Sequence, residues 1–253
     1  MTTIEYVYVA FAAVAAGAIN AVAGGGSLIT FPTLVAIGLP PVTASITNTV
    51  ALCPGYLGAT LAQRRDLAGQ GKRAAMLLPI GAVAGVAGAF LLLNTDEGAF
   101  DFAVPFLLLF AAILVGAQDK IRTLLFGRER AHRAEGWAVL PVALAGVYGG
   151  YFGAGMGVMI LAALGIVLAD ELLRINALKQ CVSLSVNVAA AGVFVFSGRI
   201  DWPVAGVMLV CALVGGLIGG KIASKIPAKY LRWLVVVLGV ALSIVYFAKV
   251  LRA

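Results

Sequence analysis

The residues best suited to binding chemistry lie in a break within a hydrophobic run, GAINAVAGGGSLITFPTL, at residues 17–34. Glycine permits the non-helical dihedral angles and the close backbone approach that such a break requires. A helix that restarts after the three glycines has up to four unpaired backbone N–H groups and a partial positive charge at its N-terminus. The pattern therefore predicts a site for a small anion, held by Gly24, Gly25, Gly26 and the hydroxyl of Ser27. The alternative is a packing break, where small residues only let helices cross.

Amide and hydroxyl side chains also fall at apparent membrane depth in the first half of the chain. Asn20 precedes the glycines, and Asn48 lies between Thr47 and Thr49 in the run SITNTVALCPG. Polar groups at that depth are tolerated where they line a cavity or meet a partner. They therefore either contribute to the binding site or form hydrogen bonds between helices.

The second half offers a lysine, a serine and two amides in LKQCVSLSVN, namely Lys179, Ser183, Gln180 and Asn187. A lysine at the centre of a membrane helix costs roughly 2.5 to 3.5 kcal/mol on insertion scales, so it is a functional candidate by default. Lys179 lies near the start of its predicted helix, and the alternative is that it extends to the interface. Asn187 lies two turns further along the same helix face and cannot reach water so easily.

The missing residue types narrow the chemistry. No Asp or Glu falls near the centre of a predicted span, so the interior donors suit an anion better than a cation. The only histidine, His132, lies in a charged linker, and the three cysteines are spaced neither as metal ligands nor as a disulfide framework. GGGS lacks the lysine of a phosphate-binding loop. We expect no enzyme activity, no metal and no cofactor.

The composition indicates that membrane-spanning helices position these residues. Of the 253 residues, 62% are hydrophobic and 11% are charged, against about 25% charged in soluble proteins, and the mean hydropathy is +1.05. Several windows reach the roughly 20 apolar residues that a helix needs to cross a membrane. Only Glu5 is charged before the first run, which indicates a retained helix and not a cleaved signal peptide. We predict an all-α polytopic membrane protein.

We expect about eight to ten membrane segments. The apolar segments are 4–23, 26–39, 42–62, 74–93, 100–118, 137–152, 153–169, 175–197, 203–220 and 231–250. Segments 26–39 and 153–169 are short and flanked by glycine, which is typical of re-entrant or half-spanning helices.

The chain repeats itself. A second break, GVYGGYFGAGMGVMI at residues 146–160, follows the first by 129 residues. At that offset three pairs of glycines correspond: Gly17 with Gly146, Gly24 with Gly153, and Gly26 with Gly155. Arg64 and Asp66 match Arg199 and Asp201 at an offset of 135. We therefore predict two homologous half-repeats, 1–118 and 136–253, joined by a charged cytoplasmic linker, 119–135.

Basic residues predict the orientation of the halves. Three connections, at 64–73, 119–135 and 221–232, hold 13 of the 18 lysines and arginines, as cytoplasmic loops do. The net charge of +7 is therefore explained by membrane topology and by attraction to anionic lipid. We expect no nucleic-acid partner. If all three connections face the cytoplasm, the matching loops at 63–73 and 198–202 lie on opposite faces and the halves are inverted. Parallel halves are the alternative.

The motifs AGAINAVAGGGSLITFPTLVAIGLPPVTASITNTVAL, PGYLGA and RRDL resemble those of the sulfite exporter TauE/SafE family, also called the 4-toluene sulfonate uptake permease family. GVYGGYFGAGMGVMILAAL and SGRIDW resemble its second half-repeat. The resemblance implies a multi-pass carrier of the bacterial inner membrane for sulfur-containing anions such as sulfite or sulfonates. An anion channel and a non-transporting membrane subunit are the alternatives, and homo-oligomerisation is left open.

The family signature falls on Asn20, the three glycines, Ser27 and the Thr47–Thr49 run. The second half departs from it, because Ala154 stands opposite Gly25 and Met156 stands opposite Ser27. Gly153 and Gly155 remain candidates there, with Lys179, Gln180 and Asn187. If the halves share one site and rock around it, we expect the first break to hold the anion most directly.

Overall fold

The computed structural model describes residues 1–126, 135–168, 170–222 and 228–250, and within them the chain is helical with no strand. The helices are α1 (Thr3–Val22), α2 (Ser27–Ala36), α3 (Pro41–Ala62), α4 (Gly71–Leu93), α5 (Glu97–Phe126), η1 (Glu135–Ala138), α6 (Val139–Tyr151), α7 (Met156–Val167), α8 (Leu172–Val195), α9 (Trp202–Ile222) and α10 (Ala228–Val250). Each predicted apolar segment coincides with one of the ten α-helices. Most of the charged linker, including His132, lies outside the described residues.

Five helices are long and apolar enough to cross a membrane: α1, α4, α8, α9 and the part of α5 that ends at Gln118. Helix α3 has 22 residues but carries the polar run SITNT, which lowers its hydropathy. Many large apolar side chains point outward, among them Phe11, Val83 and Val210, each more than 60% exposed. Such a surface is stable only in lipid. The predicted all-α polytopic membrane protein is confirmed.

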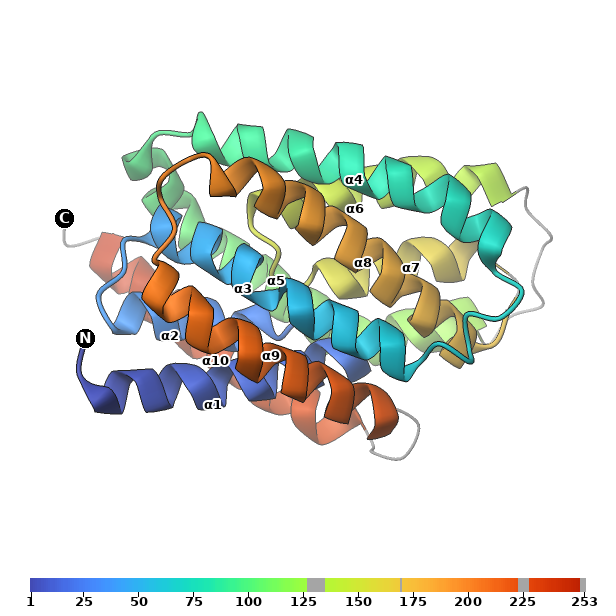
Figure 1. Ribbon diagram of the computed structural model, residues 1–253, viewed down its shortest axis with the longest axis horizontal. Coiled ribbons are helices and arrows are strands. Elements are labelled where there is room, and N and C mark those ends of the chain that lie inside the picture. The colour runs from blue at the N-terminus through green and yellow to red at the C-terminus, as the bar shows by residue number, and fades with distance from the viewer. Residues whose placement is uncertain (127–134, 169, 223–227, 251–253) are drawn as a thin grey trace.

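Two helical hairpins interrupt the parallel arrangement of the long helices. Helix α1 enters from the end where the chain begins, and α2 returns the chain to that end, where α3 starts (Figure 1). Helices α6 and α7 form the second hairpin, which enters from the opposite end. With 10 and 12 residues, α2 and α7 are about 15 and 18 Å long at 1.5 Å per residue, roughly half of the hydrocarbon core.

The packing partners of the two halves correspond. Helix α9 packs on α1 and α3, and α4 packs on α6 and α8, while α5 pairs with α10 and α3 with α8. Exchanging each helix for its counterpart five places along the chain maps this set of contacts onto itself. The arrangement fits two inverted half-repeats, which stay a prediction.

Small residues set the distance between these helices. A Cβ at Gly215 of α9 would overlap the carbonyl oxygen of Val14, and one at Gly219 would lie 2.5 Å from the Cα of Ala18. On α4, a Cβ at Gly85 would overlap the carbonyl oxygen of Val186. The G-x-x-x-G spacings therefore do what such motifs do in lipid, where close backbone approach maximises dispersion contacts.

The helix ends that flank the three basic connections all lie at one end of the bundle, on the right in Figure 1. The acidic connection before α5 and the connection between α8 and α9 lie at the other end, where α1 begins and α10 ends. The positive-inside rule predicts that the basic end faces the cytoplasm.

Candidate functional site

The tips of the two hairpins meet inside the bundle. A Cβ at Gly24 would lie 3.1 Å from the Cα of Gly157, so the two backbones are in direct contact. The Cδ and Cε atoms of Lys179, from α8, lie 3.9 Å from the corresponding position at Gly157. Two glycine breaks that are distant in sequence and a buried lysine are therefore neighbours.

Asn20 closes the break of the first hairpin. Its Oδ1 accepts hydrogen bonds from the N–H groups of Gly25, at 3.0 Å, and Gly26, at 2.7 Å. The positive φ angles of Gly24 (71°) and Gly25 (138°) reverse the chain toward α2 and place these N–H groups at the Asn20 amide. Two donors that the sequence suggested for an anion are therefore engaged within the protein. The N–H of Ser27 makes no hydrogen bond with the described residues.

The second hairpin has no such cap. The residue 129 positions after Asn20 is Gly149, and the side chain of Met156 fills the space above it, because a Cβ at Gly149 would overlap Met156 Sδ. Gly153 and Gly155 have φ angles of 79° and 80°. Within the described residues, no hydrogen bond is made by the N–H groups of Ala154, Gly155 or Gly157. The unpaired donors are thus more numerous in the second hairpin than in the first.

Polar side chains of α8 bind the carbonyl groups at the end of α1. Lys179 Nζ lies 3.2 Å from Asn20 O, and Gln180 Nε2 donates to both Asn20 O (3.0 Å) and Ala21 O (2.9 Å). Asn176 Nδ2 also donates to Ala21 O, at 3.1 Å. The last carbonyls of a helix lack intrahelical partners and carry partial negative charge, so these donors stabilise a helix end inside the membrane.

Lys179 has no carboxylate partner among the described residues. Its side chain is 0% exposed, and its one hydrogen bond, to Asn20 O, uses one of its three donors. The four ion pairs of the described chain involve other residues. The alternative that Lys179 extends to the interface is wrong, because the side chain is enclosed by protein. A buried cation without a counter-ion is costly unless an anion accompanies it.

The polar run of α3 makes hydrogen bonds within the protein. Asn48 Oδ1 accepts from Thr30 Oγ1 of α2 at 2.5 Å, and Thr47 Oγ1 accepts from Asp201 N before α9 at 3.1 Å. Thr49 Oγ1 donates to Ser45 O of its own helix. The hydrogen bonds given for these three residues are therefore to groups other than Lys179.

On α8, Asn187 Nδ2 donates to Ser183 O one turn away. The hydroxyl of Ser183 and the Oε1 atom of Gln180 are buried and have no hydrogen-bond partner in the described part of the chain. Ser183 lies four residues after Lys179, so both fall on the same face of α8. Ser183 was among the residues that the sequence offered, whereas Asn176 was missed; a polar residue one turn before the buried lysine was the available signal.

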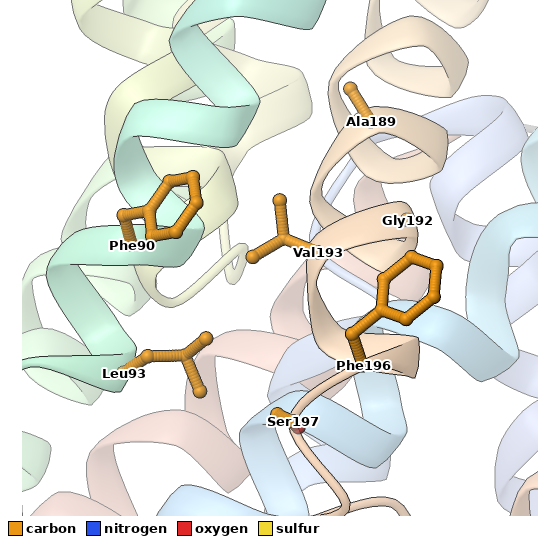
Figure 2. A pocket seen from close by; sticks show the side chains of 7 residues that line it. All are labelled: Phe90, Leu93, Ala189, Gly192, Val193, Phe196 and Ser197. Atoms are coloured by element: carbon orange, nitrogen blue, oxygen red, sulfur yellow. The ribbon is translucent and has the colours of Figure 1, made fainter.

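A cleft of ≈ 440 Å³ lies away from the hairpin tips, between the C-terminal parts of α4 and α8. Figure 2 shows Phe90 and Leu93 on one side and Val193 and Phe196 on the other. Ser197 is its one polar side chain, and that hydroxyl donates to Phe194 O at 2.6 Å. An apolar lining of this kind offers nothing to a small anion.

Comparison with known proteins identifies the class. The family described as sulfite exporter TauE/SafE matches residues 9–246. The probable membrane transporter protein YfcA of Escherichia coli (strain K12) is 27% identical over 239 residues, covering 92% of this chain and 86% of the relative. The probable membrane transporter protein ORF9 of Sinorhizobium sp is 28% identical over 235 residues, covering 92% and 88%. No solved structure matches the chain.

The chain belongs to the sulfite exporter TauE/SafE family. It is a multi-pass membrane transporter of the bacterial inner membrane and not an enzyme, as the family and the helices that can span a membrane establish together. The resemblance in the sequence motifs is confirmed.

Proposed function

We propose that this transporter carries small sulfur-containing anions, sulfite or organosulfonates, by alternating access. The observation that supports an anionic substrate is the amine of Lys179, which is fully buried, has no carboxylate partner in the described chain and lies beside the point where the two hairpin tips touch. A sulfite or sulfonate group presents three oxygens, and several fixed donors in a dry interior can replace its hydration.

The packing of the helices supports a rocking mechanism. The hairpins enter from opposite ends and meet at their tips, as in transporters whose site lies at the interface of inverted repeats. Rocking one half against the other would expose the tips first to one side and then to the other. The glycine contacts along α4 and α9 provide smooth surfaces for such sliding.

The test is counterflow in proteoliposomes loaded with sulfite, sulfoacetate or taurine. We expect saturable exchange by the wild type for at least one anion, and a loss of at least a hundredfold for Lys179→Gln. Lys72→Gln is the matched control, because Lys72 is exposed at the start of α4, and its exchange should equal that of the wild type. Equal activity of Lys179→Gln would remove the basis for an anionic substrate. Ohmic currents in place of saturable exchange would identify a channel.

A further inference from the structure

We propose that the N-terminal end of α7, in the second hairpin, is the oxyanion-binding element of this protein, with Lys179 as counter-ion and Ser183 as an additional donor. This assignment rests on the proposed function and specifies its site. It reverses the expectation from the sequence, which favoured the GGGS of the first hairpin.

The first reason is the distribution of unpaired donors. In the first hairpin, Asn20 accepts from two N–H groups at the turn, and among the described contacts only the N–H of Ser27 stays unpaired where α2 begins. In the second hairpin, the N–H groups of Ala154, Gly155 and Gly157 have no acceptor in the described part of the chain. Buried backbone donors are rarely left without a partner. A bound anion satisfies all three at once.

The second reason is independent of the helix end. Lys179 is fully buried, has a single hydrogen-bond acceptor among the described residues, Asn20 O, and passes beside Gly157. Ser183, one turn further along α8, is 0% exposed, and its hydroxyl has no partner among the residues that the structure describes. A positive helix N-terminus, the amine of Lys179 and a hydroxyl unpaired within the described chain lie on neighbouring elements, and such a donor set suits a sulfonate or sulfite group.

Met156 explains why the second break stays uncapped. Its thioether occupies the space above Gly149 that the amide of Asn20 occupies in the first hairpin. A thioether sulfur is a weak acceptor and does not compete for the N–H groups. The side chain has three rotatable bonds, so it can withdraw when an anion enters.

The decisive variant gives the second hairpin the cap of the first. In Gly149→Asn with Met156→Ser, the new amide should accept from the N–H groups of Ala154 and Gly155, as Asn20 does at Gly25 and Gly26. Removing the thioether opens the space for the new side chain, and Val186 Cγ1, 3.1 Å from a Cβ at Gly149, must yield slightly. We expect at least a tenfold weaker affinity for sulfite or sulfoacetate by titration calorimetry in detergent, and a matching rise in the KM of counterflow.

Met156→Ser alone separates the loss of the thioether from the gain of the cap, and the double variant should bind at least tenfold more weakly than this single variant. If the double variant binds and transports like the wild type, the assignment to α7 is overturned while the transport function stands. If the wild type neither binds nor exchanges any of the anions, the proposed function itself fails.

A second measurement needs no variant. Hydrogen–deuterium exchange of the wild type in nanodiscs, with and without sulfite, should show slower exchange at residues 153–159 and unchanged exchange at residues 20–29. Slower exchange confined to residues 20–29 would return the site to the first hairpin. An equal change with sodium chloride at the same concentration would show a salt effect and also overturn the assignment.

Discussion

In the α1–α2 hairpin the amide of Asn20 bridges the break and binds two N–H groups, whereas in the α6–α7 hairpin Gly149 stands at the matching position and Met156 fills the space. Both hairpins use left-handed glycines and both tips reach the centre of the bundle. The two hairpins therefore share a backbone shape but differ at one position. Where Asn20 stands, the N–H groups of the turn are paired within the protein; where Gly149 stands, they have no partner among the described residues.

The hairpins also differ at their open ends. Arg73 of α4 binds Glu135, before α6, at 2.8 Å and Asp170, after α7, at 2.5 Å. It thereby holds together the two legs of the second hairpin. The described ion pairs include none that joins the legs of the first hairpin. The first hairpin is fixed at its tip and the second at its base, which leaves the second tip freer to rearrange around a substrate.

The largest contrast is expected from matched glycine substitutions at the two tips. Gly26 has an ordinary φ of −57°, but a Cβ there would overlap the carbonyl oxygen of Ala16. Gly155 has the left-handed φ of 80°, and its Cβ would lie 3.3 Å from Ala111. Gly26→Ala should lower the free energy of unfolding by about 3 kcal/mol or more, and Gly155→Ala by about 1 to 2 kcal/mol. Reversible unfolding in mixed micelles measures both, and the opposite order would contradict the packing described for the first tip.

Removal of the Asn20 cap should have the next largest effect. Asn20→Ala leaves the N–H groups of Gly25 and Gly26 buried without an acceptor, which costs about 1 to 3 kcal/mol. Asn187→Ala is the control, because that amide is about equally buried and its one hydrogen bond within the described chain is to Ser183 O of its own helix. It should cost about 1 kcal/mol or less. Equal losses in the same unfolding assay would show that Asn20 is no cap.

The sequence predicted the helices well and the donors poorly, for a physical reason. Helix positions follow from hydropathy, and glycines locate the breaks, so the ten segments and both glycine breaks were visible in the pattern. Whether an N–H is free depends on where one side chain points after the chain reverses. Nothing in the spacing of Asn20 and Gly25 states that the amide turns back onto the glycines and not toward a ligand.

Residues at helix ends were hidden for a similar reason. Asn176 and Gln63 lie near basic connections and look like interfacial residues, yet Asn176 Nδ2 donates to both Gln63 Oε1, at 2.8 Å, and Ala21 O. They are buried because α1 ends inside the bundle, where its last carbonyls require donors. That requirement becomes visible only when the hairpin is placed against α3 and α8.

The smallest effect is expected at the base of the second hairpin and depends on pH. Burial alone would raise the pKa of the Asp170 carboxyl, but the hydrogen bonds from Arg73 and from the Glu171 N–H, with the charges of Arg174 and Arg73, lower it. A carboxyl whose pKa is lower in the folded state stabilises the fold above its unfolded pKa of about 3.9. That contribution is lost as the pH falls through the folded-state value.

The free energy of unfolding of the wild type should therefore lose this contribution only below about pH 4, which would be measured as a lower melting temperature. Asp170→Asn should remove the same contribution at neutral pH. The expected loss at pH 7 is about 0.5 to 1 kcal/mol, because the pair is partly solvated. Glu97→Gln is the control at the other end, since the Arg199–Glu97 pair is exposed and 3.6 Å long, and it should leave melting unchanged.

In hydrogen exchange, Asp170→Asn should speed exchange in η1 and the start of α8 without affecting residues 20–29. Faster exchange in the first hairpin as well would show that Arg73 stabilises the whole bundle, and the proposed division between a hairpin fixed at its tip and one fixed at its base would be wrong.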